Sequence, residues 1–199
     1  MEIIKLTVGR FKTNCYIVYV PERGDCAVID PGNEADKILK AVQGRAISAI
    51  LLTHGHFDHI AALPYLFSHD TVIYIHPGDK EMLSNPVLNV SERFGDRVII
   101  DKETRSVFDH DSLYEAGLSF SVMSTPGHSP GSVCYLTGGS MFTGDTLFSN
   151  GYGATDMPGG NFSDLRVSLR RIMRIPDDYQ IHPGHGPGRL LSEIRGAFR

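Results

Sequence analysis

The sequence predicts an α/β (α+β) fold of two similar halves, each a sheet with helices packed on one face. Strand-like runs interspersed with helical segments occupy the first half of the chain, and the same order returns in the second half. One run, residues 46–52, is apolar except for Ser48, which is typical of a strand covered on both faces. The chain of 199 residues is 41% hydrophobic and contains no linker or low-complexity stretch, so we expect one domain over residues 1–199.

The first half is expected to open with an antiparallel meander and then to alternate strands with helices. Polar or Gly-containing turns separate the strand-like runs. Gly44 ends the first predicted helix, and the next strand delivers the chain to Thr53. The predicted strands are 2–8, 14–20, 25–30, 46–52 and 71–75, and the predicted helices are 34–43 and 60–67.

The second half is expected to be rich in strands and to end in a short strand before His185. Residues 80–109 lack regular patterning and form a long connection, which we interpret as a lid or substrate-binding flap. A Gly-rich loop, 149–160, leads into a helix that begins near Phe162 with Asn161 as its cap. The predicted strands are 118–123, 132–136, 140–143 and 179–181.

Charge and hydropathy argue against several classes of function. The formal net charge is -4 and no run of Lys or Arg offers a phosphate-neutralising stripe, so neither nucleic acid nor an anionic membrane is an expected partner. The N-terminus lacks a secretory signal and no apolar stretch is long enough to span a bilayer, so we expect a cytoplasmic protein. Cys15, Cys26 and Cys134 lie outside any C-x-x-C motif, which predicts three buried thiols.

A cluster of potential metal ligands follows the apolar strand at 46–52. Three imidazoles and a carboxylate fall within six residues, and only a turn would make them converge. In an extended segment His54 and His56 share one face, while Asp58 and His59 lie at the start of the next helix, so one loop can serve two adjacent ions. A lone His is more often an ordinary polar group, but this clustering predicts a metal site.

Three further strand ends each present one potential ligand. His128 lies between Pro and Gly residues, Asp145 follows the next strand, and His185 stands in Pro-Gly-His-Gly. The full set of five imidazoles and two carboxylates suits two divalent ions with a bridging carboxylate and open positions for water. We expect two Zn²⁺ per chain, with iron or manganese as alternatives, because nitrogen and oxygen donors without thiolate select zinc only weakly.

This series of residues resembles that of the metallo-β-lactamase superfamily, and particularly its glyoxalase II-like (hydroxyacylglutathione hydrolase-like) branch. The resemblance covers nearly the whole chain and implies a four-layer αβ/βα sandwich, with two mixed sheets flanked by helices. Asp30 matches a further superfamily motif, which implies a supporting place behind the ligands. By resemblance, the first metal is held by His54, His56 and His128, the second by Asp58, His59 and His185, and Asp145 bridges them.

The match to the glyoxalase II-like branch includes informative departures. Class B1 β-lactamases have Cys where Asp145 stands, so the resemblance does not favour antibiotic hydrolysis. Glyoxalase II has a C-terminal helical domain that clamps glutathione, whereas only fourteen residues follow His185 here, enough for one helix. Ala154 stands where members of the branch often have Arg, and Gly186 where glyoxalase II has an aromatic residue. These departures argue against strict glutathione specificity.

The predicted activity is hydrolysis of a small acyl thioester such as S-lactoylglutathione. A metal-bridging hydroxide would act as the nucleophile, the ions would polarise the carbonyl, and Asp58 would take up or relay a proton. A thiol with a pKa of about 8.5 departs as thiolate without a general acid. Tyr152, in the Gly-rich loop, is a candidate substrate contact or a packing aromatic. The sequence does not predict the oligomeric state.

Two alternatives remain open at this stage. The first is a persulfide dioxygenase, whose relatives use one iron at positions that match His54, His128 and Asp145. The second is a binding module that keeps the fold without catalysis, although a complete ligand set argues against it.

Overall fold

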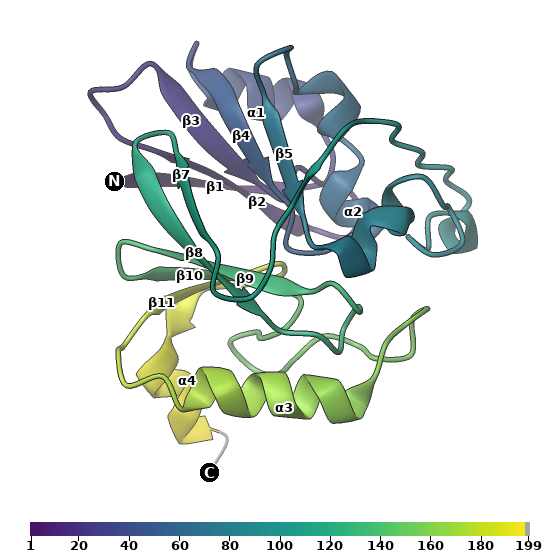
Figure 1. Cartoon of the computed structure of the whole chain (residues 1–199), viewed down its shortest axis with the longest axis vertical. Helices are drawn as coiled ribbons and strands as arrows, with labels where there is room; N and C mark the ends of the chain where they lie inside the picture. Colours follow the sequence, from purple (N-terminus) through teal and green to yellow (C-terminus); the bar gives the residue numbers. More distant parts are fainter. Residues whose placement is uncertain (198–199) are drawn as a thin grey trace.

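The computed structural model describes residues 1–197, and it contains two six-stranded sheets packed face to face with helices on their outer sides (Figure 1). This arrangement is the predicted four-layer αβ/βα sandwich. The first sheet has the order β1 (Glu2–Val8), β2 (Thr13–Tyr19), β3 (Asp25–Ile29), β4 (Ala46–Leu51), β5 (Val72–Ile75) and β6 (Arg105–Ser106). The second has the order β12 (Arg189–Leu190), β11 (Gln180–Pro183), β10 (Ser140–Gly144), β9 (Val133–Thr137), β8 (Leu118–Ser124) and β7 (Ser112–Glu115).

Both sheets are mixed. In the first sheet, β1, β2 and β3 pair antiparallel, whereas β3, β4, β5 and β6 pair parallel. In the second sheet, β10 and β11 pair parallel and the other neighbours pair antiparallel. The helices are α1 (Ala35–Ala41), α2 (Phe57–Ile60), α3 (Phe162–Met173) and α4 (Leu191–Ala197), with 3-10 turns η1 (Leu63–Tyr65), η2 (Pro77–Leu83) and η3 (Glu92–Phe94).

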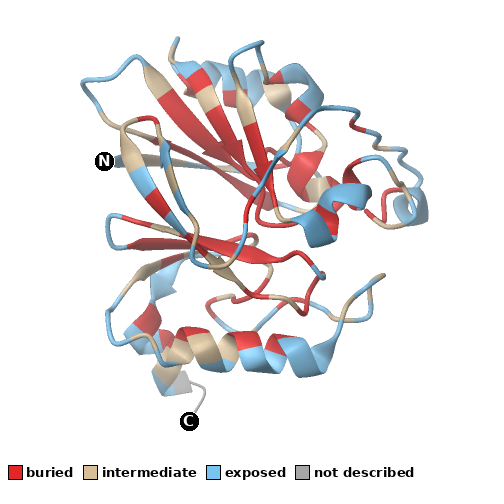
Figure 2. Ribbon diagram, viewed as in Figure 1, coloured by how far each residue is buried: buried red, intermediate tan, exposed pale blue. Residues whose placement is uncertain are grey.

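Three apolar clusters hold the four layers together, and Figure 2 shows burial concentrated along the strands. The middle cluster joins the two sheets, with Tyr16 of β2 facing Phe142 of β10 at 5.2 Å between ring centroids. One outer cluster packs Ile38 of α1 on the first sheet, and the other packs Ile172 of α3 on the second. The three cysteines are free and buried, as predicted.

The helix predicted over residues 60–67 differs from the structure. The chain instead forms α2 three residues earlier and then the separate turn η1. The amide of Ala62 donates to the carbonyl of Pro31 at 3.0 Å, outside any helix, and Pro64 has no amide with which to continue a helical ladder. As a result, α2 begins inside the predicted ligand cluster and holds Asp58 and His59.

The other differences lie at sheet edges and element ends. The short edge strands β6, β7 and β12 were not predicted. Asn161 caps α3 as expected, because its side-chain oxygen accepts from the amides of Ser163 and Asp164. No helix within residues 1–197 is long and apolar enough to cross a membrane.

Candidate metal centre

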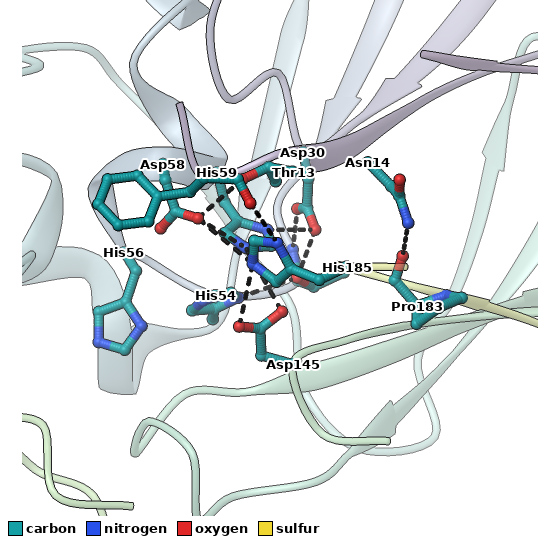
Figure 3. A network of polar contacts seen from close by, with 12 residues as sticks. Thr13, Asn14, Asp30, His54, His56, Asp58, His59, Asp145, Pro183 and His185 are labelled. Carbon is teal, nitrogen blue, oxygen red and sulfur yellow. Dashed lines mark hydrogen bonds and ion pairs between the residues drawn. The ribbon is translucent and has the colours of Figure 1, made fainter. Parts of the chain in front are cut away.

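The seven predicted ligands gather where strands of both sheets end, and Figure 3 shows all of them except His128 labelled. His54 and His56 leave β4, and Asp58 and His59 follow in α2. The second sheet supplies the remaining three, from the β8–β9 connection, the end of β10 and the end of β11: His128, Asp145 and His185. Residues 131 positions apart in sequence, from His54 to His185, therefore meet at one edge of the sandwich.

Six of these side chains form two groups that could each hold an ion. Within each group the ligand atoms lie within 4.8 Å of one another. Asp145 lies between the groups: its Oδ1 is 3.5 Å from Nε2 of His59, and its Oδ2 is 3.7 Å from Nε2 of His128 and 3.4 Å from Nε2 of His185. The first group is His54, His56 and His128, and the second group is Asp58, His59 and His185.

Four of the imidazoles are anchored through Nδ1, so in the neutral ring Nε2 is the nitrogen that can accept. His59 donates to Asp30 at 3.0 Å, His128 to the carbonyl of Ala154 at 2.7 Å, and His185 to the carbonyl of Phe11 at 3.1 Å. His54 donates to Oγ1 of Thr53 at 3.1 Å, because that hydroxyl gives its own proton to Asp30 at 2.6 Å. Such anchoring through the other ring nitrogen is typical of metal-bound histidines.

His56 faces the neighbouring ligand His128 with Nδ1 instead of Nε2. Its Nδ1 lies 2.8 Å from Nε2 of His128. The ring centroids of these two residues are 4.6 Å apart and nearly perpendicular, so both nitrogens face the same small volume. The first group therefore offers two Nε2 atoms and one Nδ1 atom.

Unpaired buried atoms test whether this volume suits a cation. Two acceptors of the centre, Nε2 of His54 and Oδ1 of Asp145, are buried without a hydrogen-bond partner among the described residues. A buried acceptor without a partner costs about 1–3 kcal/mol. Divalent ions would satisfy acceptors of this kind, and the histidine and aspartate cluster fits a dinuclear metal site.

Protons are distributed unevenly between the histidines of the two ligand groups, because burial and the neighbouring carboxylates shift their pKa values in opposite directions. Burial acts to lower the pKa of His59 and His185, but the carboxylates beside them raise the two values to about 9 and about 10. Burial lowers the pKa of His56 to about 3, and neighbouring His128 adds to this effect. Burial would raise the pKa of Asp58, yet His59 holds it at about 2. Without metal, imidazolium charges on the second group therefore neutralise the carboxylates.

Sequence reasoning missed several residues that connect the ligands to the scaffold. Oγ1 of Thr13 donates to Asp58 at 2.8 Å. The side-chain amide of Asn14 donates to the carbonyls of Pro183 and Gly186, which flank His185, at 2.9 Å each. Ordinary polar residues in a strand give no signal in the sequence, because their partners are up to 172 positions away.

The long connection at 80–109 is internally bonded beside the first group. The side-chain amide of buried Asn89 donates to the carbonyls of Met82 at 2.8 Å and Val98 at 3.0 Å. The carbonyl of Asn89 accepts from the amide of Phe57 at 3.0 Å, next to His56. A backbone hydrogen bond therefore joins this part of the connection, which we call the wall, to the segment that holds His56.

A groove of about 610 Å³ lies between this wall and the Gly-rich loop. The loop on one side of this groove also provides Ala154, whose carbonyl anchors His128. Apolar and charged side chains line it together: Val87, Val90, Glu92, Arg93, Asp156, Met157 and Pro158.

Tyr152 lies in the Gly-rich loop beside the groove-forming residues in sequence. Its side chain is 44% exposed, and its ring is 5.9 Å from that of Phe162. The next residue, Gly153, donates its amide to the carbonyl of Asp145 at 2.9 Å. The loop thus brings Tyr152 near the centre while leaving its ring accessible.

Comparisons with known proteins agree with this site. The family model described as "Metallo-beta-lactamase superfamily" matches residues 8–185. The hydroxyacylglutathione hydrolase GloC of Haemophilus influenzae is 32% identical over 196 residues, which cover 94% of this chain and 90% of GloC.

Two solved structures are also similar. The BLEG-1 B3 metallo-beta-lactamase is 32% identical with a TM-score of 0.89, over 96% of this chain and 95% of that one. The protein TTHA1623 in a di-iron-bound form is 35% identical with a TM-score of 0.85, over 96% of each chain. From the family match and the clustered ligands together, we identify the chain as a member of the metallo-beta-lactamase superfamily and a metal-dependent hydrolase within it.

Proposed function

We propose that this protein is a dinuclear hydrolase of small acyl thioesters, of the glyoxalase II-like kind, with zinc as the metal. The observation that supports two ions is the position of Asp145 between two complete ligand groups, with a buried oxygen that has no partner within the described chain. The proposed ligands are His54, His56 and His128 for one ion, Asp58, His59 and His185 for the other, and Asp145 between them.

Bound ions would supply a hydroxide nucleophile and Lewis-acid polarisation of the substrate carbonyl. The protein's own residues set the orientation of this chemistry. Asp30, Thr53 and the two anchoring carbonyls hold the imidazoles so that no ring has to rotate during turnover.

Asp58 is the proposed acceptor of the nucleophile's proton. One of its oxygens accepts from Thr13 at 2.8 Å, which fixes the carboxylate. Its low pKa keeps it ionised at neutral pH, so it suits a hydrogen-bond acceptor better than an acid. A reaction assisted by an ionised Asp58 favours substrates whose leaving group needs no protonation.

Thioesters meet this requirement. A thiol of pKa about 8.5 leaves as thiolate near neutral pH, whereas an alcohol or amine needs a proton. The similarity to the H. influenzae hydroxyacylglutathione hydrolase supports the same substrate class. The groove between residues 87–93 and 156–158 is the proposed place for the substrate, and Tyr152, in the same loop as residues 156–158, is a proposed contact.

The test is a substrate panel on metal-loaded protein, combined with elemental analysis. We expect about two zinc ions per chain and hydrolysis of S-lactoylglutathione or of another short acyl thioester, followed by ultraviolet absorbance. The variant Asp58→Asn tests the proposed role of this carboxylate in the same panel, because it preserves the side-chain shape and removes the charge. A single iron per chain with oxygen consumption on glutathione persulfide, and no thioester hydrolysis, would overturn the proposal in favour of a persulfide dioxygenase.

Hydrolysis of β-lactams is a second candidate. The similarity to the BLEG-1 B3 metallo-beta-lactamase favours it. The presence of Asp145 in place of Cys separates this chain from class B1 enzymes. A chromogenic cephalosporin in the same panel would decide the question, and turnover of it faster than of every thioester would make lactam hydrolysis the better assignment.

A further inference from the structure

Asp79 is a buried carboxylate that joins two segments of the metal centre. It follows β5, in the first turn of η2, and its side chain is fully buried. Its Oδ2 accepts from the amide of Gly55 at 2.9 Å and from Oγ of Ser129 at 2.6 Å, and its Oδ1 accepts from the amide of Gly131 at 2.6 Å. Gly55 separates the two histidines of the β4 exit, while Ser129 follows His128.

These segments belong to different sheets. The β4 exit, with His54 and His56, comes from the first sheet, and the β8–β9 connection, with His128, comes from the second. Asp79 therefore connects all three first-group imidazoles through hydrogen bonds to their immediate chain neighbours, without lying among the ligands itself.

Close packing around Asp79 leaves the two segments little freedom to move independently. A Cβ added at Gly131 would lie 2.7 Å from Oδ1 of Asp79, and one at Gly55 would lie 2.6 Å from Cβ of Met82. A Cβ at Gly78 would lie 3.0 Å from Cα of Gly131. Three glycines thus allow the backbones to approach the carboxylate closely.

The second group is connected across the sheets by a different residue. Asn14 of β2 bonds to the carbonyls of Pro183 and Gly186, on either side of His185, and the hydroxyl of Tyr16 donates to Pro183 at 2.7 Å. Figure 3 shows Asn14 reaching Pro183 beside the second group. Each ligand group therefore has its own cross-sheet connection.

We propose that Asp79 is the positioning residue of the first metal group, holding His54 and His56 at a fixed distance from His128, while Asn14 serves the second group. The proposal rests on the dinuclear centre of the proposed function but not on its substrate. A buried carboxylate with three donors is costly to disturb, because any donor left without an acceptor loses its bond in a site without water.

Asp79→Asn is the informative variant. Asparagine has one carbonyl oxygen, so its amide must face the N–H of either Gly55 or Gly131. We expect the affinity of the first group for Co²⁺ to fall about 10- to 100-fold, with the affinity of the second group changing less than about threefold. Asn14→Ala is the matched control, and we expect it to weaken the second group instead.

Co²⁺ titration separates the two groups by spectroscopy without any substrate. The ring protons on Nδ1 of His128 and of His185 are held by carbonyl oxygens, so each gives a shifted proton resonance when its own group binds the paramagnetic ion. Appearance of the His128 resonance at a higher Co²⁺ concentration in Asp79→Asn than in the wild type, with the His185 resonance appearing as in the wild type, would support the proposal. Equal weakening of both groups, or of neither, would overturn it.

Ser129→Ala keeps the test decisive if Asp79→Asn does not fold. This change removes one of the three donors and leaves both backbone bonds to the carboxylate. We expect a smaller loss of Co²⁺ affinity, about 3- to 10-fold, that is again confined to the first group. Unchanged affinity in this variant would overturn the proposal. Because only metal binding is measured, a failure here is distinct from a failure to hydrolyse thioesters.

Discussion

Asp30 accepts a hydrogen bond from Nδ1 of His59 at 3.0 Å, and the same carboxylate accepts both the amide and the hydroxyl of Thr53. One buried side chain at the end of β3 therefore sets both the direction of the β4 exit and the free nitrogen of a proposed ligand. The position of Asp30 behind the ligands agrees with the place that the resemblance implied for it.

Asp30→Asn should weaken metal binding at the second group. Asparagine cannot accept all three donors, so either Thr53 or His59 loses its partner. We expect about 10- to 100-fold lower zinc affinity, measured by competition with a chromogenic chelator. Asp25→Asn, at the other end of the same strand in a surface pair with Arg23, is the control and should bind zinc normally. Wild-type affinity in Asp30→Asn would contradict the assigned role.

Gly184→Ala should prevent assembly of the centre. An added Cβ would collide with Oδ1 of Asp145 and would lie 2.7 Å from Cε1 of His59. We expect zinc content well below that of wild type, measured by elemental analysis of the purified protein. Gly24→Ala is the control, because an added Cβ there meets no atom of the described chain within 4 Å. Normal zinc content in Gly184→Ala would show that Asp145 can occupy another position.

Much of this centre could be predicted because its signals are local. Strand ends marked by Gly and Pro next to His or Asp are visible in a few consecutive residues, and the structure brings all seven of those side chains together. Chemical type and spacing were sufficient there, since metal ligands must be particular residues in any fold.

The residues that position the ligands could not be predicted in the same way. Asn14 has no special neighbours in sequence. Asp79 follows Pro77 and Gly78 at a strand end as the ligands do, but the importance of both residues depends on partners supplied by the other sheet. The helix at 60–67 was misplaced for a related reason, because the tertiary bond from Ala62 to Pro31 decides where α2 ends. Short edge strands such as β6 were missed because two residues carry no periodic pattern.

Asn89→Ala should destabilise the connection at 80–109. The change leaves the carbonyls of Met82 and Val98 without this donor in the protein interior. We expect the free energy of unfolding to fall by about 2–4 kcal/mol, measured by urea denaturation. Exposed Asn150 provides the control, and its replacement by Ala should change stability by less than about 0.5 kcal/mol.

A second measurement, hydrogen exchange, tests whether the connection at 80–109 opens as a lid. Hydrogen exchange at the amide of Val98, which donates to Oγ of Ser91 at 3.1 Å, should be slow with or without product. Fast exchange there that slows on product binding would instead support the lid interpretation.

Tyr152→Ala should raise the KM for the thioester with little change in kcat. We propose that this accessible ring contributes apolar contact to bound substrate and takes no part in the chemistry. Tyr152→Phe should resemble wild type, because it keeps the ring that faces Phe162. Tyr114→Ala, at a 75% exposed position on β7, is the control. Unchanged KM in Tyr152→Ala would leave only a packing role for this residue.

Binding of two zinc ions at pH 7 should release about two protons from side chains, and one more from a bound water that ionises to hydroxide. In the metal-free protein His59 and His185, whose pKa values are raised to about 9 and about 10, are protonated, and each must lose a proton to bind an ion. Calorimetric titration in buffers of different ionisation enthalpy measures this number. Binding without proton release at pH 7 would show that these two imidazoles are not ligands.

The stability of the metal-free protein should depend on pH through the same groups. His59 and His185 have pKa values above the ordinary 6.5, so the stability they contribute is complete below pH 6.5 and is lost as the pH rises through about 9 to 10. His56 has its pKa lowered to about 3, so stability is also lost as the pH falls from 6.5 towards 3. Thermal denaturation of chelator-treated protein should therefore give a maximum near neutral pH. Because bound zinc replaces the protons on His59 and His185, the alkaline loss should disappear in the zinc-loaded protein, and an unchanged loss there would contradict this assignment.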